Sequence, residues 1–497
     1  MKRCAWLPLL LVSCLAALIW PAHARSRAKS TWDAPLGVPR PPFGITEQAG
    51  APTHRVRPGP GCDDGGNGTP AVPRCTIPAS LPAGAVVELS GTFTQGYDLR
   101  ARGTAAAPIF LRGASPAARP VMKAPWTVTG SYVVIENIDF ANTGATDGTL
   151  YIRAPADHVA IRHSEIHNPQ QGRGAALGIV NWRDETARTV IPTVWARNIV
   201  ILGNKIHDNG NWKAKNDQDC HGIGVGSADH VWLLDNELWH NSGDGVQVNA
   251  PRTDRAHHVF VARNLAYENK QAGFWSKTAA NVVFSQNVAH GHRPSDSSGG
   301  QGFGQQYDPQ GIWYLFNESY DNTIGMGGGD QDGTRRDVYI IGNLLRGNLE
   351  AGMRLNGGAA GDFLVALNTL VGNPVGIDNG YAGGRPTLAG NIVARSATHV
   401  RYPGGATLRR NLFDAAPRLL GVACATCVTG DPLFAGPADF RLLAGSLAID
   451  AGAAPELDAA YARYLKDYGV SIALDRDGLA RPVGAAVDIG AYEFPGK

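Results

Sequence analysis

The chain has 497 residues, of which 62 are glycine, only 4 are methionine and 18% are charged. This composition disfavours a protein built from long amphipathic helices and suits a turn-rich β architecture. The formal net charge of +2 at pH 7 is not concentrated in a basic tract, so the charge gives no support for a nucleic-acid-binding protein.

The N-terminal segment has the three parts of a secretory signal peptide. A basic start at residues 2–3 precedes an apolar run over residues 5–20, and Ala-His-Ala at residues 22–24 forms a small-x-small cleavage site. We therefore predict that residues 1–24 are a cleaved signal peptide and that the protein is secreted or periplasmic. The alternative is a lipoprotein anchored at Cys14, because "LVSC" also fits a lipoprotein cleavage box. No later stretch is long and apolar enough to span a bilayer, so we expect no transmembrane segment.

Five cysteines follow the predicted cleavage site, as two close pairs and one single residue. Cys62 with Cys75, and Cys424 with Cys427, each predict a disulfide that closes a short loop in an oxidising compartment, which leaves Cys220 unpaired. A zinc site on the second pair would need another pair or nearby histidines, and the sequence supplies neither.

Eleven segments between residues 85 and 414 share a short apolar strand, a polar residue that is usually asparagine, and a further apolar pair. The polar position recurs every 20 to 40 residues, at Asn137, Ser164, Asn204, Asn236, Asn264, Asn287, Asn317, Asn343, Asn368, Asn391 and Asn411. This period is typical of a solenoid with one coil per repeat. We interpret the asparagines as corner residues that tolerate a left-handed backbone and form hydrogen-bonded ladders.

Two further columns run parallel to the first. A second asparagine column lies five residues later, at Asn209, Asn241, Asn269, Asn322, Asn348 and Asn373. A ring column lies three residues after the first, at Phe140, His167, His207, Trp239, Tyr267, His290 and Tyr320. Stacked flat rings are a structural motif, so we interpret these histidines as ladder residues rather than catalytic ones.

A strand of the pattern x-Gly-apolar-x-apolar follows the second asparagine column in most coils. Its period of two sends one set of residues inward, namely Ile223, Val246, Phe274, Phe303, Met326, Met353 and Ile377. The whole pattern resembles an all-β, right-handed parallel β-helix of about 11 coils, which we place at residues 76–420.

The two ends of the chain lack this repeat. Residues 25–75 are rich in proline and glycine and are interpreted as a linker, and residues 421–497 as a cap over an open sheet edge. Residues 77–113 look like the opening coil of secreted bacterial β-helix proteins, including polysaccharide lyases. The tail over residues 431–494 is similar to the closing segment common to many such proteins.

The outward positions of the x-Gly strands form the candidate site, which we call the strip. Because neighbouring coils lie ~4.8 Å apart, their outward side chains lie side by side. Reading across the coils predicts a row of polar, charged and aromatic side chains made of His221, Asp244, Gln247, Asn249, Trp275, Lys277, Gln306, Arg354 and Asn356. An indole can stack on a sugar ring, and cations can pair with carboxylates, so the predicted partner is an acidic polysaccharide. We expect the chain to be monomeric.

Two insertions interrupt the corner that precedes the strip, over residues 210–221 and 293–301. Long loops on a regular scaffold tend to carry function, and we expect these two to form the walls of a cleft. The first insertion supplies Asp217 and Asp219 near Asp244, and three carboxylates could hold Ca²⁺, although solvated turn residues give the same pattern. A second acidic loop, with Asp330 and Asp332, is a weaker metal candidate.

The resemblance to β-helix polysaccharide lyases implies a lysine or arginine base and, in many cases, Ca²⁺ on the uronate. Lys277 is the candidate base, with His221 and Asp244 as the other catalytic candidates, and Asp217, Asp219 and Asp244 as the candidate Ca²⁺ ligands. Trp275, Gln247, Asn249, Gln306, Arg354 and Asn356 are the candidate substrate-binding residues. Lys277 also fits an ordinary solvated strand lysine.

Two other functions remain open. The segment "CHGIGVGS", residues 220–227, looks like the His-Gly strand of polygalacturonases, with Asp219 and Asp244 as an inverting acid and base. The paired-Asp motifs and the later Arg-x-Lys of that family are missing here. The third interpretation is a non-catalytic carbohydrate-binding β-helix.

Overall fold

The computed structural model describes residues 32–180, 183–184, 189–190, 194–251, 254–328, 336–355, 363–379, 385–452 and 455–496. The predicted signal peptide and the alternative anchor Cys14 lie outside these ranges. Within them, no helix has the length and hydropathy of a membrane span.

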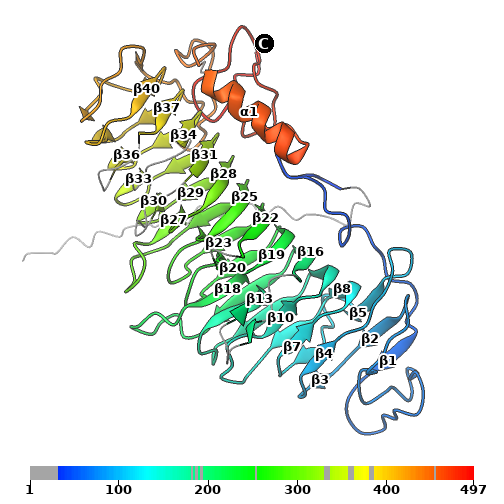
Figure 1. Cartoon of the computed structure of the whole chain (residues 1–497). Coiled ribbons are helices and arrows are strands. Elements are labelled where there is room, and N and C mark those ends of the chain that lie inside the picture. The colour runs from blue at the N-terminus through cyan, green and yellow to red at the C-terminus, as the bar shows by residue number, and fades with distance from the viewer. Residues whose placement is uncertain are drawn as a thin grey trace, which may run out of the picture.

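The described chain forms a parallel β-helix whose coils stack along one axis (Figure 1). Each coil contributes a strand to each of three parallel sheets. Sheet 1 has 14 strands: β1 (His54–Val56), β2 (Val86–Leu89), β5 (Ile109–Gly113), β8 (Ser131–Glu136), β11 (Asp157–Arg162), β16 (Ala196–Leu202), β19 (Ala228–Leu234), β22 (Ala256–Ala262), β25 (Ala279–Ser285), β28 (Gln310–Leu315), β31 (Arg336–Ile341), β34 (Phe363–Ala366), β37 (Thr387–Ala389) and β40 (Thr407–Arg409).

Sheet 2 also has 14 strands: β3 (Thr92–Phe93), β6 (Val121–Met122), β9 (Asp139–Ala141), β12 (Glu165–Asn168), β17 (Lys205–Asn209), β20 (Glu237–Trp239), β23 (Leu265–Tyr267), β26 (Val288–His290), β29 (Glu318–Tyr320), β32 (Leu344–Arg346), β35 (Thr369–Val371), β38 (Ile392–Ala394), β41 (Leu412–Phe413) and β43 (Val428–Thr429). Sheet 3 has 13 strands: β4 (Tyr97–Leu99), β7 (Trp126–Val128), β10 (Leu150–Arg153), β13 (Gly174–Val180), β18 (Cys220–Val225), β21 (Val246–Val248), β24 (Phe274–Ser276), β27 (Gln301–Gln305), β30 (Ile324–Gly328), β33 (Ala351–Arg354), β36 (Val375–Asp378), β39 (Thr398–Arg401) and β42 (Leu419–Leu420). A short antiparallel hairpin, β14 (Arg183–Asp184) and β15 (Thr189–Val190), and one helix, α1 (Pro455–Tyr468), complete the elements.

The predicted coil count is confirmed, because the eleven repeats correspond to the eleven strands of sheet 1 from β8 to β40. Three earlier strands, β1, β2 and β5, extend the sheet toward the N-terminus. Strand β1 lies inside residues 25–75, the segment that we predicted to be a linker. Its three residues pair in register with β2, so this part of the segment belongs to sheet 1. Both predicted disulfides are present, Cys62–Cys75 and Cys424–Cys427, and Cys220 is a buried free thiol.

The first asparagine column is a continuous hydrogen-bonded ladder. The side-chain oxygen of Asn287, for example, accepts from both the backbone and the side-chain N–H groups of Asn264, at 3.0 and 2.9 Å. Its own side-chain nitrogen donates to the Val261 carbonyl at 2.8 Å and to Asn317 at 3.0 Å. Each buried amide therefore satisfies backbone groups that the corner would otherwise leave unpaired.

Our assignment of the left-handed backbone to the ladder asparagines was wrong. The residue immediately before each ladder position has the positive φ, as at Asp235 (54°) and Arg263 (53°). In the first repeat Asn137 (φ 56°) occupies this preceding position, and Ile138 stands in the ladder, where its N–H donates to Ser164 Oγ. The first repeat is consequently shifted by one residue from our alignment.

The ring column on sheet 2 is confirmed from His167 to Tyr320, with one correction. Neighbouring rings in the column are stacked with interplanar angles of 12° or less. The stacked residues are His167, His207, Trp239, Tyr267, His290 and Tyr320. Phe140 does not belong to it, because Phe140 pairs with Ile166 and is fully buried. The one-residue shift of the first repeat explains this difference.

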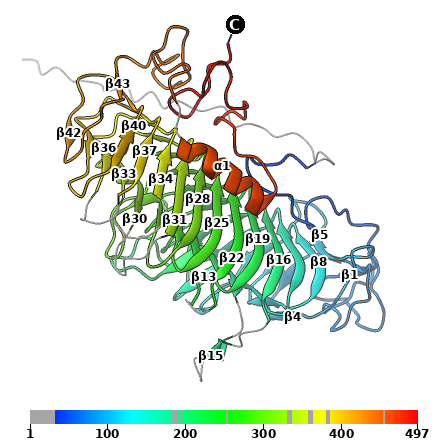
Figure 2. The same ribbon diagram turned by 45° about the horizontal axis from the view of Figure 1, so that its top comes forward.

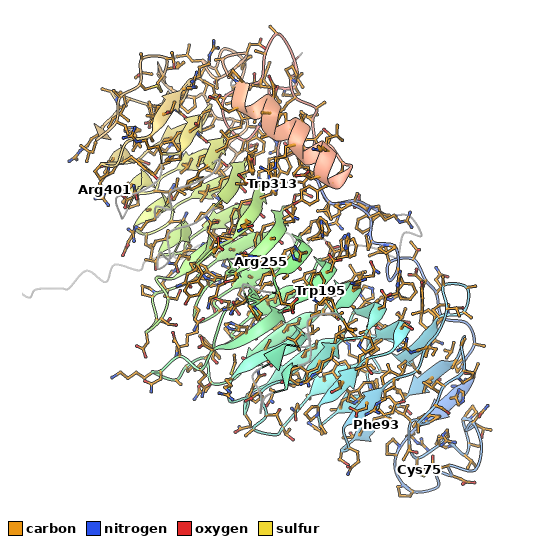
Figure 3. All side chains as sticks on the ribbon, in the orientation of Figure 1. Cys75, Phe93, Trp195, Arg255, Trp313 and Arg401 are labelled. Carbon is orange, nitrogen blue, oxygen red and sulfur yellow. A yellow bond between two sulfur atoms is a disulfide. The ribbon has the colours of Figure 1, made fainter. Side chains whose placement is uncertain are left out.

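The interior and the two packed faces account for most apolar residues. The predicted inward row of sheet 3, from Ile223 to Ile377, is at most 2% exposed. The outer face of sheet 1 is also apolar: Trp313, which lies beside α1 in Figure 3, packs edge-on against Tyr464 at 4.8 Å. The predicted C-terminal cap thus runs along sheet 1 instead of only closing the end, as Figure 2 shows for α1. Residues 440–451 and 489–494 pack against sheet 2.

Candidate functional site

The backbone register of sheet 3 brings the predicted strip residues together. Gly224, Gln247, Trp275 and Gly304 align in one outward row across β18, β21, β24 and β27. Asn249, Lys277 and Gln306 form the next outward row, because the N–H groups of Lys277 and Gln306 continue the ladder to Val248 and Ser276 at 2.8 Å each. These seven residues occupy adjacent positions on neighbouring coils.

Trp275 lies flat along the sheet. A Cβ atom on Gly304 would come within 2.8 Å of its Cη2, so the indole covers the glycine of the next coil. The side chain is only 8% exposed. We predicted an open stacking platform, but the indole shapes the floor of the strip, since the absent side chain at Gly304 lets the ring lie down.

A buried hydrogen-bond network lies beside this floor. Asp244 Oδ1 accepts from the Ala272 N–H at 3.0 Å, and its Oδ2 accepts from Gln247 Nε2 at 2.7 Å. His221 Nδ1 accepts from the backbone N–H of Asp244 at 2.9 Å. A nitrogen that accepts this bond carries no proton, so the neutral ring is protonated on Nε2.

The charges of this network follow from its burial. Burial lowers the pKa of His221 in spite of the nearby Asp244 and Asp219 carboxylates, and the positive charge of Lys277 lowers it further. Burial raises the pKa of Asp244, although His221, the Gln247 amide and Lys277 favour its ionised form. Both shifts place Lys277 in the same electrostatic neighbourhood as His221 and Asp244.

Lys277 differs from the other predicted cation of the strip. Its side chain is half-buried, its Nζ lies 5.9 Å from the ring centre of Tyr307, and no carboxylate of the described residues is within ion-pair distance. Arg354 instead pairs with Glu350 at 3.0 Å and with Asp378 at 3.4 Å. Lys277 therefore has an amine available for a ligand, whereas Arg354 is already neutralised.

The two insertions, which we expected to form separate walls, are hydrogen-bonded to each other. Asp217 Oδ2 in the first insertion accepts from Ser295 Oγ at 2.7 Å and from Ser297 N–H at 3.0 Å in the second. Gln271 also links the loops, donating to Asp219 Oδ1 at 2.6 Å and to Ser297 Oγ at 3.0 Å. Both loops precede strands of sheet 3 at the same corner, which is why they meet.

The three proposed Ca²⁺ ligands do not converge. Asp217 Oδ1 lies 3.6 Å from Lys270 Nζ, and hydrogen bonds occupy the oxygens of Asp244. Among the described residues, the only group of three potential ligands within 4.8 Å of one another lies elsewhere. The Asp217, Asp219 and Asp244 set therefore does not fit a bound Ca²⁺, and the loop connection explains Asp217.

Three of the predicted residues, Asn356, Asp330 and Asp332, lie outside the described residues, and one residue near Lys277 was not predicted. Tyr307 was missed because it follows the end of the x-Gly pattern with a positive φ of 64°, where alternation no longer predicts its direction. Asn249 is exposed, and its Nδ2 donates to Gln247 Oε1 at 3.3 Å.

Comparison with known proteins supports the fold. Residues 180–324 match the sequence family described as a right handed beta helix region. The chain carries a right-handed β-helix. The match covers under a third of the chain. No curated protein sequence matches it significantly.

Three solved structures illustrate the likeness. A pectate lyase has 15% identity, covering 90% of this chain and 98% of its own, with a TM-score of 0.42. A periplasmic alginate epimerase has 12% identity over 71% of this chain and 78% of its own, with a TM-score of 0.42. A lacto-N-biosidase from Eubacterium ramulus has 13% identity over 76% and 67%, with a TM-score of 0.47. At such identities the likeness concerns the fold alone.

Proposed function

We propose that the protein is an extracytoplasmic polysaccharide lyase that cleaves a uronate-containing polymer by β-elimination on the outer face of sheet 3. One observation carries the proposal: Lys277 has no carboxylate partner among the described residues and stands between Asn249 and Gln306 in one outward row of neighbouring coils. A solvated surface lysine would not need such surroundings, whereas a base acting on an acidic sugar would.

The reaction requires a base and donors for the developing charge. A neutral lysine amine takes the proton from C5 of the uronate, and a C4–C5 double bond forms. The C4–O bond breaks with its electron pair on the leaving oxygen, which takes up a proton from water. The negative charge that builds on the carboxylate needs hydrogen-bond donors or a cation. Asn249 and Gln306 supply amide N–H groups on either side of Lys277, and His221 supplies a proton on Nε2.

Asp244 holds neighbouring side chains in place and does not itself react with the substrate. Asp244 has its two oxygens bonded to Ala272 and Gln247 and its side chain only 4% exposed. Such a group positions Gln247 and His221 and is poorly placed to exchange protons with a substrate. This argues against the hydrolase alternative, in which Asp244 would be the acid or the base.

The spacing of the coils suits a polymer that lies along the helix axis. A repeat of ~4.8 Å per coil is close to the length of one sugar ring, so successive coils would face successive sugars. Arg354 lies in the same outward row as Trp275, three coils and ~14 Å further along it, and would meet a more distant subsite. Its two carboxylate partners reduce its value as a uronate ligand.

A panel of polymers tests the proposal. Purified mature protein is incubated with polygalacturonate, alginate and a glucuronate-containing polymer, each with added Ca²⁺ and with a chelator. We expect ultraviolet-absorbing unsaturated ends to appear in step with new reducing ends, and to persist with the chelator. Reducing ends without ultraviolet absorbance would show a hydrolase, and polymer retention without either product would show a binding protein.

A further inference from the structure

A cluster of imidazoles and one carboxylate lies on sheet 1, away from the strip. Asp229 and His230 are successive residues of β19, and His258 lies on β22 of the next coil. Asp229 Oδ1 is 2.9 Å from His230 Nδ1 and 3.0 Å from His258 Nδ1. The two imidazole rings stack at 4.5 Å. In the described part of the chain, these three form the only such group with ligand atoms within 4.8 Å of one another.

The backbone of sheet 1 explains why the side chains meet. His230 and His258 have φ values of 57° and 51°, at a position where the successive coils from β8 to β31 take a left-handed residue. Other coils place Asn198 and Asn281 there, and asparagine adopts this conformation readily. The corner therefore requires the backbone shape but does not require histidine.

An equivalent pair two coils earlier provides an internal comparison. Asp157 and His158 on β11 repeat the Asp-His dipeptide, with Asp157 Oδ1 2.9 Å from His158 Nδ1. The next coil places Asn198 at the left-handed position, and its Nδ2 donates to Asp157 Oδ1 at 2.8 Å. One carboxylate and one imidazole meet at β11, whereas a carboxylate and two imidazoles meet at β19.

We propose that Asp229, His230 and His258 bind a divalent transition-metal ion, of which Zn²⁺ is the representative. Two imidazole nitrogens and one carboxylate oxygen form a donor set that suits Zn²⁺, Cu²⁺ or Ni²⁺ and disfavours Ca²⁺ and Mg²⁺. The ion replaces the hydrogen bonds from the two Nδ1 atoms to Asp229 Oδ1, and each neutral ring then carries its single ring proton on Nε2.

The geometry needs little adjustment for the ion. Ligand atoms around a tetrahedral Zn²⁺ are about 3.3 Å apart for bond lengths of about 2.0–2.1 Å, so the two N–O separations must widen by a few tenths of an ångström. All three side chains are half-buried, which leaves an open position for water. Burial of Asp229 opposes its ionisation, but the hydrogen bonds from His230 and His258 outweigh this and lower its pKa.

The ion would join two coils of sheet 1. His257, which pairs with Asp229 in the β19–β22 register, stacks on Trp195 at 5.4 Å and lies 6.4 Å from the ring of His258. The strip lies on sheet 3, so the proposed ion affects the stability of the coils and takes no part in the reaction proposed above.

Calorimetric titration of untagged, metal-free protein with Zn²⁺ tests the site. We expect one ion per chain with micromolar or tighter affinity and a rise in the thermal midpoint on binding. His258→Asn, which keeps a residue suited to the left-handed backbone, is expected to weaken binding at least tenfold. His158→Asn, the same change at the equivalent left-handed position three coils before His258, is expected to leave binding unchanged.

A gain-of-site variant makes the test independent of folding defects. Asn198→His places a second imidazole beside Asp157 and His158, and it is expected to raise the stoichiometry from one to two Zn²⁺. The proposal is overturned if wild-type protein shows no saturable Zn²⁺ binding, or if His258→Asn binds Zn²⁺ as tightly as the wild type.

Discussion

Replacing Lys277 with methionine is expected to lower the turnover of a uronate polymer by about 10²–10⁴-fold, the usual contribution of a general base. Methionine keeps an unbranched chain of nearly the same length beside Tyr307 and removes only the amine, so folding should be unaffected. Initial rates are followed by the ultraviolet absorbance of the unsaturated product. Lys205→Met, a matched change of an exposed lysine on sheet 2, should retain full activity.

Lys277→Arg separates a base from a simple cation. Arginine keeps the positive charge for binding a uronate, but it stays protonated and cannot accept the C5 proton as readily. We expect this variant to retain much of the polymer affinity and little of the turnover. Wild-type turnover in either Lys277→Met or Lys277→Arg would contradict the role given to this residue.

The second large effect concerns the acid stability of the helix. His292 replaces an asparagine in the second ladder, where it is fully buried and its Nδ1 lies 2.8 Å from Asn322 Oδ1. Burial lowers the pKa of His292 to about 3, although the bond to Asn322 opposes the shift. In the unfolded chain the imidazole takes up its proton near pH 6.5.

Stability should therefore fall as the pH decreases from about 6.5 to about 3. In this window the unfolded state binds a proton that the folded state excludes. The free energy of unfolding therefore falls by about 1.4 kcal/mol per pH unit and by about 5 kcal/mol in total. His292→Asn restores the ladder residue and should remove most of this dependence. The measurement is the free energy of urea unfolding at pH 7 and pH 4.5 for both proteins, with His240→Asn as the partly exposed control. An equal loss in wild type and His292→Asn would refute the explanation.

The fold could be predicted from the sequence because its restraints repeat. Each coil must satisfy the same buried corner groups, so asparagine recurs and its spacing marks the coils. What the spacing could not show was the residue that turns the corner, because left-handed positions accept Asp, Arg, Gln and Phe as well as Gly. Aligning by asparagine identity therefore misplaced Asn137 by one residue.

For the candidate site, the sequence predicted which residues occupy adjacent positions on neighbouring coils, but not how their side chains lie. Positions on neighbouring coils follow from the repeat, and these brought Lys277, Asn249 and Gln306 together. The direction of a side chain along the axis depends on the next coil, however, and Trp275 lies down because residue 304 is glycine. The neutralisation of Arg354 by Asp378, one coil further along the same row, could have been read from the register.

The metal cluster was missed for a different reason. His230 and His258 belong to a column on sheet 1 whose positive φ the sequence does not reveal, since Asn198 and Asn281 fill the same position. Only the three-dimensional stacking of neighbouring coils brings both imidazoles to Asp229. Sequence spacing alone gives no sign of it.

Proton NMR of a cleavable uronate polymer, incubated with the protein in D₂O, tests the central claim most directly. The account predicts new vinylic signals from 4,5-unsaturated ends that grow with chain cleavage, and their loss in Lys277→Met but not in Lys205→Met. Saturated ends, or an uncleaved polymer with deuterium at C5, would contradict β-elimination on the strip.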